Sequence, residues 1–150
     1  MKADTQKVIL NLPATAEFVD VVRLNLYGIA SKMGFSYEDI EDMKVAVSEA
    51  CNNSVLYAYG QNDGHIDVTF EIGEETLSIT VEDEGESFES VRGIGEESTL
   101  HDKDLNDVQI GGLGFYLMQA LMDNVSIENV AGQGTRVVMS KSLALSEERV

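Results

Sequence analysis

The fold is decided by residues 36–59, which read SYEDIEDMKVAVSEACNNSVLYAY. Ser36 followed by Asp39 resembles a capping box at the start of a helix. Positions at helical spacing then predict one side packed against a core; they are Ile40, Met43, Val47, Cys51 and Ser54 or Val55. We therefore expect a long helix that continues to about Tyr59.

Shorter elements surround this helix. Alternating polar and apolar residues predict a strand over 8–12, and Thr15 is a candidate cap for a helix that runs to Met33. Further strands are expected over 66–72, 77–81, 125–130 and 135–140, with a short helix over 113–122. This order predicts an α/β two-layer sandwich, in which helices cover one face of a mixed, mostly antiparallel sheet.

The length suits one compact domain, taken as residues 1–150. Residues 86–112 are acidic and rich in glycine without a sustained period. A loop of this length is typical of a lid or a binding loop. Residues 142–150 are expected to form a frayed tail.

The charge and the apolar content exclude several kinds of partner. The 27 acidic and 10 basic residues give a net charge of −17, which repels a phosphate backbone and argues against direct nucleic-acid binding. No apolar run approaches the roughly 20 residues that span a bilayer, and the single Cys51 excludes an internal disulfide. We expect a cytoplasmic protein with no membrane contact; its acidity suits a basic protein partner or serves solubility alone.

Glu49 and Asn53 carry the first chemical signal. They lie four residues apart on the long helix and therefore share a face, among small and apolar neighbours. An Asn carbonyl oxygen can coordinate Mg²⁺, and a nearby Glu can accept a proton from a hydroxyl group or from water. A polar stripe on an amphipathic helix is the alternative interpretation of the same pattern.

Three glycine motifs follow. Asp83 at a strand end can accept a hydrogen bond from the amino group of a base, and Gly85 lets a ligand approach the backbone; an ordinary Asp-x-Gly turn is the alternative. The motif GGLGF over 111–115 opens a helix and leaves backbone N–H groups for phosphate oxygens, although it is not a P-loop. Gly134 and Thr135 by themselves indicate a hairpin followed by a strand.

The order of these motifs resembles the GHKL ATPase superfamily, which includes gyrase, Hsp90, histidine kinases and MutL. Within it, the wider context is similar to the serine-protein kinases known as anti-sigma-B factors. That similarity rests on residues 40–50 (IEDMKVAVSEA), 85–88 (GESF), 111–118 (GGLGFYLM) and 121–123 (LMD). It covers the chain from about Val8 to Lys141. Ser87 stands where a second glycine is usual, and Asn52 where threonine is common.

The resemblance implies a Bergerat ATP-binding fold and a role for each motif. Glu49 would be the general base that activates the partner's hydroxyl group, and Asn53 would hold Mg²⁺ against the triphosphate of ATP. Asp83 and Gly85 would contact adenine, with Thr135 beside them. Backbone N–H groups would close a lid over the phosphates; they belong to Gly111, Gly112, Leu113, Gly114 and Phe115. Arg23 matches a first-helix arginine that contacts partner proteins in the related sporulation anti-sigma factor.

The function implied by the resemblance is that of an anti-sigma factor and protein serine kinase. Such a protein sequesters a stress-type sigma factor and uses Mg-ATP to phosphorylate the anti-anti-sigma antagonist, a STAS-type protein, and it works as a homodimer. A nucleotide-gated binding module without kinase activity is the main alternative. The ATP-binding half of a histidine kinase would need a separate phosphoacceptor protein, and a gyrase-like or Hsp90-like motor would need a transducer domain for which this chain has no room.

Overall fold

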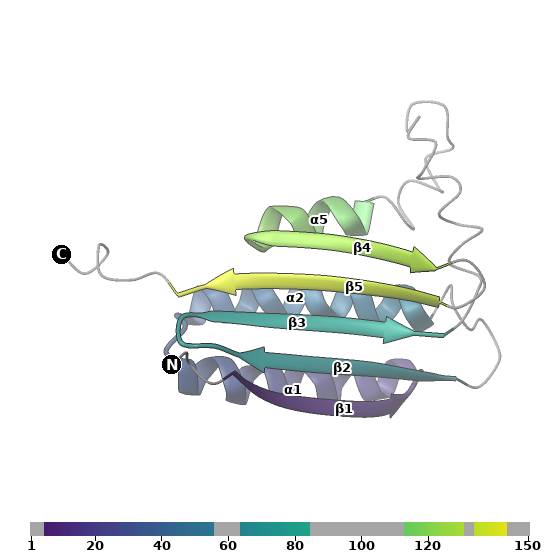
Figure 1. Ribbon diagram of the computed structural model, residues 1–150, viewed down its shortest axis with the longest axis horizontal. Helices are drawn as coiled ribbons and strands as arrows, with labels where there is room; N and C mark the ends of the chain where they lie inside the picture. The colour runs from purple at the N-terminus through teal and green to yellow at the C-terminus, as the bar shows by residue number, and fades with distance from the viewer. Residues whose placement is uncertain (1–4, 56–63, 85–112, 131–133, 144–150) are drawn as a thin grey trace.

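A computed structural model of the chain describes residues 5–55, 64–84, 113–130 and 134–143. Within these ranges, five strands form one sheet, and three helices form a second layer on one of its faces (Figure 1). The elements follow in the order β1 (Gln6–Pro13), α1 (Ala16–Met33), α2 (Tyr37–Asn53), β2 (His65–Ile72), β3 (Thr76–Asp83), α5 (Leu113–Leu121), β4 (Asn124–Val130) and β5 (Gly134–Ser142).

The strands of the sheet lie in the order β1-β2-β3-β5-β4, and every described pair is antiparallel. The α/β sandwich expected from the sequence is confirmed. Side chains alternate between the two faces of a strand, and on β3 the residues Leu77, Ile79 and Val81 are buried beneath the helices. The residues between them lie on the opposite side, which we call the open face of the sheet.

The register of the central strands brings two distant residues together. Asp83, the last residue of β3, pairs with Thr135 near the start of β5. Helix α5 begins at this same end of the sheet (Figure 1). Residues predicted to act together therefore come from different elements that meet at one end of the sandwich.

Helix α2 lies between α1 and α5 and packs against both (Figure 1). The fully buried side chains of both layers form one core, whose largest members include Phe70, Leu26, Met43 and Met118. Burying a side chain of this size contributes about 1.5–3 kcal/mol. Because α2 has a helix packed on each side, it is held along both flanks, and this packing positions its polar side chains.

The helix ends follow local chemistry. Ser36 begins α2 as predicted, because its Oγ accepts a hydrogen bond from the backbone N–H of Asp39 at 3.1 Å. Gly34 ends α1 with a φ of 102°, a left-handed conformation that suits glycine. Thr15 stands at the start of α1, but its side chain forms no capping bond; its backbone carbonyl accepts the N–H of Phe18 instead. No helix in the described ranges has both the length and the apolar content to cross a membrane.

Two boundaries differ from the expectation. The regular part of α2 ends at Asn53, and Ser54 and Val55 continue in a wider π-type turn; the rest of the helix expected to about Tyr59 lies outside the described residues. At the other end of the chain, β5 extends to Ser142, and Leu143 donates its N–H to the carbonyl of Glu75 at 2.7 Å. These first two residues of the expected tail are therefore held by the sheet.

Candidate functional site

Glu49 and Asn53 meet α5 at its first turn. Both side chains are half-buried. Gly114 approaches so closely that a Cβ atom placed on it would lie 2.8 Å from Oε1 of Glu49 and 3.8 Å from Nδ2 of Asn53. We call Glu49, Asn53 and Gly114 the helix cluster. The structure thus brings together three residues that the sequence singled out.

The helix cluster combines groups suited to an anion and a cation. Within the described part of the chain, neither Glu49 nor Asn53 forms a side-chain hydrogen bond or ion pair. Backbone N–H groups in the first turn of α5 have no partner within the helix, and a helix N-terminus favours negative charge. A carboxylate, an amide and such an N-terminus side by side can accept a proton, hold a cation and receive phosphate oxygens.

A second cluster lies where α2, β3 and β5 meet. Ser54, Asp83 and Thr135 are the only buried polar or charged residues in the described part of the chain, with 4%, 6% and 6% of their surface exposed. Oγ of Ser54 donates to Oδ2 of Asp83 at 2.7 Å, and Asp83 pairs with Thr135 across the sheet. We call these three residues the sheet cluster. A hydrogen bond to a buried charged group contributes about 1.5–3 kcal/mol, which helps to keep the Asp83 carboxylate in the core.

The hydroxyl group of Thr135 lacks the partner that a buried polar group normally has. Its Oγ1 is buried and forms no hydrogen bond with any described residue. Such a group costs about 1–3 kcal/mol unless something binds it. The sheet cluster therefore fits a ligand that brings hydrogen-bonding groups of its own, as a nucleotide base does.

Gly134 fixes the backbone beside the sheet cluster. Its φ is 114°, and a Cβ atom placed on it would lie 1.9 Å from the carbonyl oxygen of Asp83 and 2.7 Å from Cα of Glu84. No side chain fits there, because the obstructing atoms belong to the backbone. The glycine thus allows β5 to begin directly against the end of β3.

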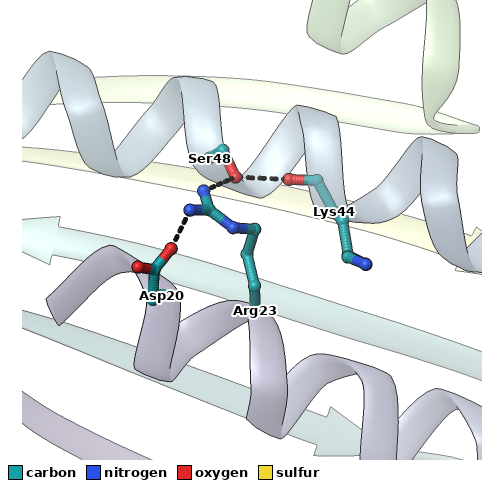
Figure 2. A network of polar contacts seen from close by, with 4 residues as sticks. All are labelled: Asp20, Arg23, Lys44 and Ser48. Atoms are coloured by element: carbon teal, nitrogen blue, oxygen red, sulfur yellow. Dashed lines mark hydrogen bonds and ion pairs between the residues drawn. The ribbon is translucent and has the colours of Figure 1, made fainter. Parts of the chain in front are cut away.

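Arg23 joins α1 to α2 on the side of α2 that faces away from α5. Figure 2 shows its guanidinium between Asp20 and Ser48: Nη1 donates to Oγ of Ser48 at 2.7 Å, and Nη2 pairs with the Asp20 carboxylate. Oγ of Ser48 in turn donates to the carbonyl of Lys44 at 2.6 Å. Ser48 is the neighbour of Glu49 in the sequence, so α2 carries a fixed network and a candidate base at consecutive positions. The role of Arg23 in binding partners stays a prediction.

Cys51 is a buried core residue of α2 without a disulfide. Burial raises the pKa of its thiol from 9.0 to about 12, against the smaller opposing effect of the nearby Arg23 charge. The thiol is therefore protonated at neutral pH and packs as a small apolar group.

Several predicted site residues cannot be placed. Gly85, Gly111 and Gly112, and the lid expected over 86–112, lie outside the described residues. Leu113 is the first residue of α5, and Phe115 is half-buried in its first turn.

Sequence reasoning missed Ser54 and the tight packing of Gly134. Ser54 lies at helical spacing from the core residues of α2. A serine at such a position indicates a buried hydroxyl group that needs a hydrogen-bond partner, and this was the available signal. The sequence indicates a hairpin at Gly134 and includes it among the motifs of the family resemblance, but its contact with β3 is not predictable, because the backbone that it touches comes from a strand distant in the sequence.

The described residues contain no group of three or more His, Cys, Asp or Glu side chains arranged to hold a metal ion. Mg²⁺ bound at protein–nucleotide sites takes one or two ligands from the protein and the rest from phosphates and water. Asn53 in the helix cluster fits that kind of site.

Comparison with known proteins agrees with this geometry. Residues 12–141 match the model of the histidine kinase-like ATPase domain. The serine-protein kinase RsbW of Bacillus licheniformis is 44% identical over 154 residues, covering 100% of this chain and 92% of that protein. RsbW of Bacillus subtilis is 39% identical over the same coverage, and RsbW of Listeria innocua is 45% identical over 90% of this chain and 86% of its own.

One solved structure shares the fold. The crystal structure of the RsbU and RsbW domains of a Mycobacterium tuberculosis protein matches with a TM-score of 0.63 and 22% identity; the match covers 92% of this chain and 32% of that one. The chain belongs to the histidine kinase-like ATPase domain family and, within that family, to the RsbW serine-protein kinases.

Proposed function

We propose that this chain is an ATP-dependent protein serine kinase and anti-sigma factor that sequesters a stress-type sigma factor and phosphorylates its STAS-type anti-anti-sigma antagonist. One observation carries the proposal: the helix cluster and the sheet cluster meet at the end of α2, in a chain that is similar to RsbW kinases over its whole length. Asn53 and Ser54, consecutive residues, connect the two clusters.

The sheet cluster would bind the adenine base. The carboxylate of Asp83 accepts a hydrogen bond from the exocyclic amino group, and the unpartnered Oγ1 of Thr135 lies across the strand pair from it. The residues therefore fit ATP. Gly85 would lie in contact with the same base, and Asn53 would be the protein ligand of Mg²⁺, which supplies charge neutralisation on the phosphates when bound.

The helix cluster would carry the chemistry. The backbone N–H groups of residues 111–115, which include the first turn of α5 from Leu113, would receive phosphate oxygens. Glu49 accepts the proton of the serine hydroxyl that the partner protein presents. Phosphoryl transfer depends mainly on positioning and charge stabilisation, so the close contact of Gly114 with Glu49 matters for the orientation of the base.

The alternatives are weaker. A binding module without kinase activity has no need of a half-buried glutamate beside a helix N-terminus, and the similar proteins are named as serine kinases. The ATP-binding half of a histidine kinase would transfer phosphate to histidine, which forms an acid-labile product. An assay of γ-phosphate transfer separates these hypotheses.

Partner exchange would follow from charge. The protein would work in the cytoplasm as a homodimer, for which the open face of the sheet, including the 63% exposed Ile9, offers a surface. Phosphorylation adds about −1.5 to −2 charges to the antagonist. Repulsion from a chain with a net charge of −17 would release it, and the effect would weaken as salt screens the charges.

The test is γ-phosphate transfer to a candidate anti-anti-sigma protein in the presence of Mg²⁺. We expect acid-stable label on the partner with the native chain. Glu49→Ala should bind nucleotide normally and lose about 10²–10⁴-fold in transfer. Glu38→Ala removes an exposed carboxylate from the first turn of the same helix and is the matched control.

Other outcomes reject the assignment. Acid-labile label would indicate histidine chemistry, and nucleotide binding without transfer to any cognate antagonist would leave only a binding module. Equal transfer by Glu49→Ala and the native chain would exclude Glu49 as the base.

A further inference from the structure

Ser54 stands at the junction of the two clusters. It follows Asn53 directly, so the end of α2 delivers one side chain to the helix cluster and the next to the sheet cluster. The helix widens into a π-type turn at Ser54, a local irregularity that occurs frequently at functional sites. Its side chain is 4% exposed and forms a 2.7 Å hydrogen bond with Asp83.

The chemistry of that bond is directional. An ionised carboxylate can only accept hydrogen bonds, whereas a serine hydroxyl group has a single hydrogen to donate. Because the Ser54 hydrogen goes to Oδ2 of Asp83, rotation of the carboxylate about its last side-chain bond is restricted. A restricted carboxylate presents its acceptor sites in a fixed direction within an otherwise apolar core.

We propose that Ser54 is a positioning residue for base recognition: its hydroxyl group holds the Asp83 carboxylate in the orientation that accepts the 6-amino group of adenine, and so determines the preference for ATP. This inference rests on the proposed nucleotide site and deepens it, because it names the residue that makes the contact selective. Thr135 is the third buried residue of the sheet cluster; it pairs with Asp83 across β3 and β5, and its Oγ1 has no hydrogen-bond partner among the described residues.

Selectivity follows from the hydrogen-bonding groups at position 6 of the purine ring. Adenine carries an amino group that donates a hydrogen bond to a carboxylate. Guanine carries a carbonyl oxygen, which a carboxylate repels, and unsubstituted purine carries neither group. A site built around a hydrogen bond rejects a ligand that lacks the group, because a buried partner is left unsatisfied. The rejection is strong only while the carboxylate stays aligned, and the hydrogen bond from Ser54 contributes to that alignment.

The experiment measures the dissociation constants of ATP and of purine riboside triphosphate, which lacks the 6-amino group, by competition with a fluorescent nucleotide. The native chain is compared with Ser54→Ala, Ser54→Cys and Ser54→Thr. Cysteine keeps the approximate shape with a weak donor, and threonine keeps the hydroxyl group. Cys51→Ala is the matched control, because it truncates a buried side chain of the same helix that takes no part in either cluster.

We expect the native chain to prefer ATP by about 10- to 100-fold. In Ser54→Ala and Ser54→Cys the preference should fall below about threefold, whereas Ser54→Thr and Cys51→Ala should retain it. A general structural effect would weaken the binding of both triphosphates equally and leave the ratio of their dissociation constants unchanged. Thermal melting identifies any variant that fails to fold; if Ser54→Ala does, Ser54→Cys decides.

Two outcomes overturn the inference, and they are distinguishable. If the native chain prefers ATP and the Ala or Cys variant prefers it equally, Ser54 has no positioning role while the nucleotide site stands. If the native chain binds both triphosphates equally, Asp83 does not read the amino group and base recognition by the sheet cluster fails as well. The kinase assay above then reports separately on the proposed function.

Discussion

The sheet cluster and the helix cluster hold their polar groups in different ways. In the sheet cluster, Ser54 and Asp83 are buried and bonded to one another, and the backbone beside them is packed too tightly for any side chain at Gly134. In the helix cluster, the side chains of Glu49 and Asn53 are half-buried and form no hydrogen bond with any described residue. Under the proposed function, the sheet cluster would present a fixed pattern to a base, whereas the side chains of the helix cluster would take their final positions when nucleotide binds.

The two clusters respond differently to an added methyl group, and Gly134→Ala should have the largest effect. The new Cβ atom would meet backbone atoms of Asp83 and Glu84 that cannot move aside, at a φ that disfavours alanine. We expect a loss of about 3–4 kcal/mol in the free energy of unfolding, measured by urea denaturation. An unchanged midpoint would show that the sheet cluster is less rigid than described.

Asp83→Asn tests the fixed pattern without changing its shape. Ser54 can still donate to the amide oxygen, but the amide NH₂ group would then face the amino group of adenine, donor against donor. ATP affinity should fall by at least about 100-fold in calorimetric titration. Asp67→Asn, on the open face of β2, is the control. Retained ATP affinity would remove Asp83 from the base site.

Gly114→Ala tests the adjustable cluster. Its Cβ atom would clash with the tip of the Glu49 side chain, which can rotate away, and would lie in ordinary contact with Asn53. Alanine also favours a helix over glycine. Phosphoryl transfer should fall about tenfold because Glu49, the proposed base, is displaced, while the unfolding midpoint stays the same or rises. A variant that loses stability as Gly134→Ala does would contradict the contrast between the clusters.

Gly28→Ala is the reference with which the effects of Gly134→Ala and Gly114→Ala on stability and activity are compared. Gly28 is exposed within α1, and a Cβ atom placed on it meets nothing within 4 Å. We expect a gain of about 0.5–1 kcal/mol in unfolding free energy with unchanged kinase activity. A loss of kinase activity would indicate that this face of α1 takes part in binding the substrate protein.

Local patterns predicted most of the fold. The helical spacing of Ile40, Met43 and Val47 and the alternation of Ile66 and Val68 each depend on contact with a core, and any core enforces them. The strand order could not be derived in this way, because the pairing of β3 with β5 joins segments far apart in the chain. The cap at Thr15 failed for a related reason: a backbone carbonyl satisfied the same N–H group.

The candidate site was predictable where its chemistry lies in unusual residues. A glutamate and an asparagine among apolar neighbours stand out, as does an aspartate at the end of a strand. Ser54 does not, because serine is common and its importance comes from a partner on another element, 29 positions away in the sequence. Likewise, the bond between Arg23 and Ser48 depends on how α1 crosses α2.

The pairing of Asp83 with Thr135 also has a kinetic meaning. These residues belong to strands on opposite sides of the long segment 85–112, so their contact closes a large loop and should form late in folding. A nucleotide that requires both residues binds only the chain in which this step is complete. Such a ligand shifts the folding equilibrium by mass action, so ATP would stabilise a newly made chain only after this contact has formed.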